Sequence, residues 1–65
     1  MNRATLQTYV RSTISTKPQT AEEIFKEIQK ENPSENGISL GRINIILEQL
    51  HANGKVRKQD MFFYL

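Results

Sequence analysis

The chain has no cysteine and no tryptophan, a single histidine, two prolines and three glycines among its 65 residues. Without cysteine it can form no disulfide and offers no thiolate to zinc, and one histidine does not make an imidazole cluster. Long apolar runs are missing as well, and the amino terminus lacks the apolar segment of a signal peptide. We therefore expect a cytoplasmic protein with no membrane span, no metal site and no cofactor.

Sixty-five residues are few for a catalytic domain. A chain of this size buries only about 60% of the surface that its unfolded form exposes, so one core takes nearly every apolar side chain. The sequence also lacks a glycine-rich phosphate loop, and its one histidine lies in no motif that identifies a Ser-His-Asp triad. We expect a single domain over residues 1–65 that is not an enzyme.

Charge is distributed unevenly, although the net charge is only +2. Residues 1–19 carry three basic residues and no acid, residues 20–40 carry five acids and two lysines, and residues 41–65 carry four basic residues and two acids. Such segregation makes a one-sided positive face possible, as a protein that binds a polyanion needs. A modest bias of this kind is also common in small soluble domains.

The first half of the chain predicts two amphipathic helices, because apolar residues recur every three to four positions. Leu6, Val10 and Ile14 indicate a helix over about residues 3–15, and the segment 15–19 with its proline ends it. Thr20 then begins a capping box with Glu23. This second helix spans about residues 21–31, and its expected buried residues are Ala21, Ile24, Phe25 and Ile28.

A third helix is expected over about residues 40–53, after a turn-rich connector. Ser39 can cap its start, and Ile38 can pack on Ile43 as a hydrophobic staple. Gly54 is the expected left-handed stop, whereas Gly41 is interpreted as a helix-packing position. The expected buried stripe of this helix is Leu40, Ile43, Ile46, Leu47 and Leu50.

Residues 55–65 have the β-branched, basic and aromatic composition of two short strands. We expect a hairpin with a tight turn near Gln59-Asp60. Alternation with a period of two then decides which side chains face the core. Those expected to face inward are Val56, Phe63 and Leu65, and those expected to face outward are Phe62 and Tyr64.

Three helices followed by a terminal hairpin resemble the winged helix-turn-helix family. The residues that carry the resemblance are Thr20-Ala21-Glu22-Glu23-Ile24, the stripe Ile43, Ile46, Leu47 and Leu50, then Gly54, Val56-Arg57-Lys58 and Phe63-Tyr64-Leu65. The resemblance implies an α+β fold with three helices and a two-stranded β-hairpin as the wing. Many members place the third helix in the major groove of double-stranded DNA and the wing on phosphates, whereas others bind only protein.

The resemblance thus implies a small DNA-binding protein of the transcription-regulator type. Arginine can donate to guanine, asparagine or glutamine can pair with adenine, and an aliphatic side chain can meet the thymine methyl group. A plainly solvated helix face is the alternative, in which Glu48 pairs with Arg42 or His51. The expected DNA-binding residues of the third helix are Ser39, Arg42, Asn44, Ile45 and Gln49.

Basic residues of the hairpin are expected on the phosphate backbone, where each contact adds salt-dependent affinity. Alternatively, they protect the edge of the terminal hairpin from pairing with another chain. Arg3 and Arg11 on the first helix can add phosphate contacts or serve solubility alone. The expected phosphate-binding residues of the hairpin are Lys55, Arg57 and Lys58.

A protein-binding module is the rival hypothesis. Phe62 and Tyr64, if outward, form with Ile45 an apolar surface for a protein partner or a second copy of the chain. DNA binding also favours a homodimer or a second DNA-binding partner, since one small domain offers few contacts. A continuous basic face favours DNA and a broken one favours protein. The residues whose placement discriminates the two hypotheses are Arg42, Lys55, Arg57 and Lys58.

Overall fold

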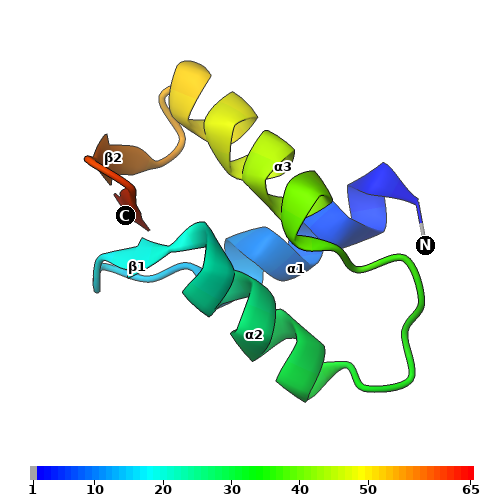
Figure 1. The fold of residues 1–65 in the computed structure, drawn as a ribbon. Coiled ribbons are helices and arrows are strands. Elements are labelled where there is room, and N and C mark those ends of the chain that lie inside the picture. The colour runs from blue at the N-terminus through cyan, green and yellow to red at the C-terminus, as the bar shows by residue number, and fades with distance from the viewer. Residues whose placement is uncertain (1) are drawn as a thin grey trace.

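The sheet lies at one end of the molecule, beside the start of one helix and the end of another (Figure 1). The computed structural model describes residues 2–65, apart from the Arg3 side chain. Its elements are α1 (Arg3–Thr13), β1 (Gln19–Thr20), α2 (Ala21–Glu31), α3 (Leu40–Ala52), β2 (Arg57–Gln59) and β3 (Phe62–Tyr64). The described residues thus form an α+β fold with three helices and a three-stranded antiparallel sheet.

Helix α2 begins with the capping box that the sequence predicts. The N–H of Glu23 donates to the Thr20 hydroxyl at 3.2 Å, and the N–H of Thr20 donates to the Glu23 carboxylate at 2.9 Å. Asn2 and Ser39 cap α1 and α3 through their own side-chain oxygens. These bonds satisfy amide groups that have no partner within a helix. Residues 21–31 are helical, as expected.

Helix α3 ends in a glycine turn. Gly54 has a φ of 72°, its N–H donates to the His51 carbonyl at 3.0 Å, and the N–H of Lys55 donates to the Leu50 carbonyl at 2.8 Å. This pair of bonds is the Schellman motif, in which glycine adopts the left-handed conformation at little cost. The predicted stop is confirmed, and the helix ends at Ala52, one residue before the expected boundary.

The sheet has one strand more than the two-stranded hairpin predicted from the sequence. β1 pairs antiparallel with β3, with Gln19 opposite Phe63 and Thr20 opposite Phe62, and the strand order is β1-β3-β2. The first helix is also shorter than predicted. The chain becomes extended at Ile14, so α1 ends at Thr13 rather than at residue 15. A strand of two residues has no alternation that a sequence pattern can detect.

The hairpin turns one residue later than predicted. Its register pairs Arg57 with Tyr64, Lys58 with Phe63 and Gln59 with Phe62. The two loop residues are therefore Asp60 and Met61, and Asp60 has a φ of 57°. Aspartate tolerates this left-handed region better than most residues, which explains a tight turn without glycine.

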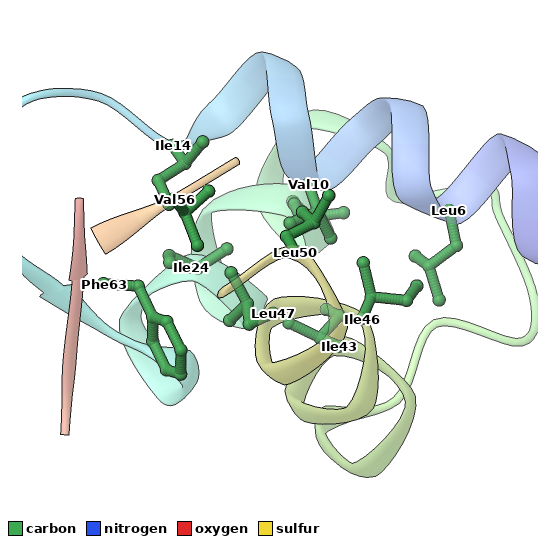
Figure 2. Packing of buried hydrophobic residues seen from close by; sticks show 11 residues of the cluster. Leu6, Val10, Ile14, Ile24, Ile43, Ile46, Leu47, Leu50, Val56 and Phe63 are labelled. Carbon is green, nitrogen blue, oxygen red and sulfur yellow. The ribbon is translucent and has the colours of Figure 1, made fainter. Parts of the chain in front are cut away.

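The core unites side chains from all three helices and the hairpin, as Figure 2 shows. No polar or charged residue is buried among residues 2–65 that the structure describes. Ile38, Phe25, Tyr9 and Ala21 pack against the core from its margin. The buried residues are Leu6, Val10, Ile14, Ile24, Ile28, Ile43, Ile46, Leu47, Leu50, Val56 and Phe63.

Two residues that the pattern assigned to the core lie outside it. Leu40 is 41% exposed because it is the first residue of α3, ahead of the turns that pack. Leu65 is 51% exposed, although its N–H donates to the Ser15 carbonyl at 2.8 Å. It follows the last paired residue of β3, so strand alternation no longer directs its side chain.

Candidate functional site

The outward surface of α3 carries the candidate site residues. Ile43, Ile46, Leu47 and Leu50 face the core, so the intervening positions point outward. We call this surface the α3 face. Its residues are Arg42, Asn44, Ile45, Glu48 and Gln49, all of which are exposed. The structure thus brings four predicted site residues together with Glu48, while the fifth, Ser39, is the N-cap of the helix.

Lys58 of β2 binds Glu48 of α3. Its ammonium lies 3.0 Å from each carboxylate oxygen and 5.3 Å from the centre of the Phe63 ring. The sequence had suggested Arg42 or His51 as the partner of Glu48. The structure shows Lys58 in that place instead. The reason is the register of the hairpin, which places Lys58 on the sheet face of Phe63, toward α3. The hairpin is thereby attached to the α3 face.

Arg42 lies at the opposite end of the α3 face. One guanidinium nitrogen donates to the Gly37 carbonyl at 3.3 Å, so the side chain turns back toward the connector. Arg42 also lines a shallow hollow of ≈ 180 Å³ together with Leu6, Ile45 and Ile46. The arginine is thus partly engaged within the chain.

A larger groove of ≈ 490 Å³ lies between the start of α2, the first turns of α3 and the hairpin loop. Gly41 is on its wall, and a Cβ atom built there has no neighbour within 4 Å. The packing role predicted for Gly41 is therefore wrong, because no other element approaches it. The residues that line the groove are Thr20, Ala21, Glu22, Leu40, Gly41, Asn44, Lys58, Met61 and Phe63.

Glu22 lies at the α2 rim of this groove, and its neighbour Glu23 belongs to the capping box. The N–H of Thr20 donates to the Glu23 carboxylate, and this bond is the largest of the effects that hold the pKa of Glu23 below its ordinary value. Glu22 forms a 3.4 Å ion pair with Lys26 one turn later.

Away from this groove, partial burial and the nearby Glu35 raise the pKa of Tyr9.

The remaining basic residues surround α3 rather than forming a patch. Lys55 follows the glycine turn at the end of α3, and Arg57 lies on the sheet face opposite to Lys58. Neither side chain has a hydrogen bond or ion pair with another described residue. With Arg42 at the other end of the helix, the four discriminating residues form a broken basic surface.

The outer face of the sheet carries the aromatic residues. Phe62 is exposed and Tyr64 is half-buried beside Arg57, so both lie on the side predicted from the alternation. Arg11 is exposed near the end of α1, and the Arg3 side chain lies outside the described residues. The aromatic pair and the α3 face therefore belong to different surfaces of the molecule.

Within residues 2–65, no three His, Cys, Asp or Glu side chains come together as metal ligands would, and His51 faces the Val56 carbonyl at 3.4 Å. None of the described helices has the length and apolar character needed to cross a membrane. No family model matches the chain, and neither a curated protein nor a solved structure matches it.

Proposed function

We propose that the chain is a winged helix-turn-helix protein that binds double-stranded DNA and acts as a transcriptional regulator. In this proposal α3 enters the major groove and the β2–β3 hairpin lies on the phosphates. The order of three helices followed by a hairpin supports the assignment, and so does the exposed polar face of α3. Members of this family present these two elements to the duplex together.

The bond between Lys58 and Glu48 carries the proposal. It attaches the hairpin to α3, so that the two elements present one surface, and it compensates the one acid of the helix. A helix of 13 residues is about 20 Å long and fits a major groove about 12 Å wide. The broken basic surface by itself favours protein binding, but in this proposal its parts contact separate phosphates: Arg42 near one end of α3, and Lys55 and Arg57 near the other, meet the backbone on either side of the groove.

A homodimer belongs to this proposal. One copy of the domain offers a single recognition helix and few base contacts, which limits specificity. Two copies on a site with two-fold symmetry would place their α3 helices about 34 Å apart, one helical turn of DNA.

A salt titration of binding to a mixed-sequence duplex, followed by fluorescence anisotropy, tests the proposal. The affinity of the parent protein is expected to fall steeply with salt, with a slope of about 0.9 per phosphate contact. Arg57→Ala is expected to lower that slope by about one contact. Lys30→Ala, which removes an exposed lysine from the far end of α2, should leave the slope unchanged. Absence of binding at low salt would contradict the proposal.

Protein binding is the second candidate, and exposed apolar residues that line the hollow beside Arg42 and the groove beside the hairpin loop favour it. Ile45 is 56% exposed and Met61 is 64% exposed, and the basic surface is broken. Exposed apolar side chains beside a groove are typical of a protein-binding surface. A parent protein that fails to bind DNA, together with loss of self-association or partner binding in Met61→Ser, would support this candidate instead.

A further inference from the structure

The two charged residues of the α3 face are both engaged within the chain. An arginine is the side chain that best recognises guanine, and a carboxylate accepts from cytosine. Here Arg42 donates to the Gly37 carbonyl, and Glu48 holds the Lys58 ammonium on both of its oxygens. Contact of Glu48 with cytosine would compete with the Lys58 ammonium, and the bond to Gly37 directs Arg42 toward the connector and occupies one of the roughly five N–H donors of its guanidinium. The folded chain therefore disfavours recognition of G·C pairs.

Neither Asn44 nor Ile45 has a side chain that is held by a hydrogen bond or an ion pair to another described residue. Asn44 is exposed on the rim of the large groove, and its amide has no hydrogen-bond partner among the described residues. A carboxamide can pair with the N6 and N7 atoms of adenine at once. Ile45 exposes more than half of its surface beside the hollow that it lines with Arg42, so its side chain is accessible from outside the helix. The thymine methyl is the apolar group in the major groove that such a side chain can cover.

The two residues are adjacent in α3, about 100° apart around the helix axis. They therefore point to different positions across the groove rather than to one base. Asn44 can contact adenine while Ile45 covers a thymine methyl of the same or a neighbouring pair. This division makes one short turn of α3 sufficient to recognise A·T pairs.

Resting on the proposed DNA binding, we infer that the protein prefers A·T-rich duplexes, with Asn44 contacting adenine and Ile45 contacting the methyl group of thymine. Arg42, Lys55 and Arg57 serve the phosphate backbone. Lys58 acts as a positioning residue, because it keeps Glu48 from the bases and from the phosphates.

Three duplexes of equal length test the inference by competition against a labelled mixed-sequence duplex. The first duplex alternates adenine and thymine. The second has the same sequence with deoxyuridine in place of every thymidine, and the third alternates guanine and cytosine. Because uracil lacks only the major-groove methyl, the first two duplexes isolate that contact. The parent protein is expected to bind the A·T duplex about tenfold more tightly than the G·C duplex. The deoxyuridine duplex should bind about fourfold more weakly for each methyl that is contacted.

The variants assign each preference to its residue. Ile45→Ala should bind the thymine and uracil duplexes equally, and Asn44→Ala should lose most of the preference for A·T over G·C while still distinguishing thymine from uracil. Leu65→Ala, which also truncates an exposed apolar side chain but lies away from α3, should behave like the parent. Both test residues are exposed, so an unchanged melting temperature will show that each variant is folded.

Each outcome has a distinct meaning. Equal binding of all three duplexes by the parent overturns the inference and leaves DNA binding in place. A thymine preference that persists in Ile45→Ala places the methyl contact elsewhere and also overturns it. If the parent binds none of the duplexes at low salt, the proposed function itself fails.

Discussion

The ammonium of Lys58 lies 3.0 Å from both carboxylate oxygens of Glu48 and covers the Phe63 ring, so one side chain joins the hairpin, the core and α3. Glu48 is the one acid in α3, and an uncompensated carboxylate at this position would repel a phosphate backbone. The lysine that the sequence assigns to phosphate therefore has a second role within the fold. Its positive charge is paired with the carboxylate of Glu48 in the same chain.

If the protein binds DNA as proposed, removing one partner of this pair should affect DNA binding more than stability. Both side chains are partly exposed, so the coupling free energy from a cycle of Lys58→Met, Glu48→Gln and the double variant should be only about 0.5 kcal/mol in urea unfolding. We expect Lys58→Met to weaken DNA binding because it uncovers Glu48. The double variant should recover affinity. If it binds as weakly as Lys58→Met, then Lys58 contacts phosphate directly.

Gly54 and Gly41 have different backbone conformations, so replacing each by alanine should change stability in opposite directions. Gly54 has a φ of 72°, so Gly54→Ala should destabilise the protein by about 1 kcal/mol, although the space for a methyl group is open. Gly41 lies in the first turn of α3 and also has open space around it. Gly41→Ala should stabilise the protein by about 0.5 kcal/mol, because alanine restricts the unfolded chain and favours helix.

Thermal unfolding followed by circular dichroism measures both glycine variants. For a domain of this size, 1 kcal/mol corresponds to a shift of about 4–8 °C in Tm. A destabilised Gly41→Ala would mean that another element packs on Gly41, which is the helix-packing role that the sequence had suggested.

Local signals explain which parts of the fold the sequence could predict. The capping box of Thr20 and Glu23 and the stop at Gly54 each involve residues within a few positions of one another, and both are present in the structure. The boundaries of α2 and the burial of Val56 follow from the same short-range patterns. Phe63 is buried as the alternation predicts.

Contacts between distant segments explain the rest. β1 exists because Gln19 and Thr20 meet β3, more than forty residues later, and no pattern within a two-residue segment announces that pairing. The partner of Glu48 depends on the hairpin register, which moved by one residue from the expected turn. For the site, the sequence could name the exposed residues of α3. It could not show that two of the charged ones, Arg42 and Glu48, are engaged within the chain.

The capping box makes stability depend on pH. The N–H of Thr20 donates to the Glu23 carboxylate and lowers the pKa of Glu23 in the folded state. Ionised Glu23 therefore stabilises the folded state relative to the unfolded state. This contribution is complete above the ordinary pKa of a glutamate and is lost as the pH falls below it and through the lowered pKa of the folded state. Glu23→Gln should therefore lose less stability than the parent over that range.

Urea unfolding at several pH values measures this difference. Glu27→Gln changes another acid of α2 but keeps the capping box, and it should retain the steep loss of the parent. Parallel curves for the parent and Glu23→Gln would contradict the role assigned to this carboxylate.

The burial of Val56 and Leu65 tests whether the carboxyl-terminal segment follows the structure or the simple alternation of its sequence. The alternation places Val56 and Leu65 together in the core. The structure buries Val56 in the core cluster (Figure 2) but leaves half of Leu65 exposed. Val56→Ala removes two buried methyl groups and should lower the free energy of unfolding by about 2 kcal/mol. Leu65→Ala, which removes more atoms, should change it by less than about 0.5 kcal/mol, since the backbone bond to Ser15 remains. Urea unfolding followed by far-ultraviolet circular dichroism measures both values, and comparable losses in the two variants would place Leu65 in the core.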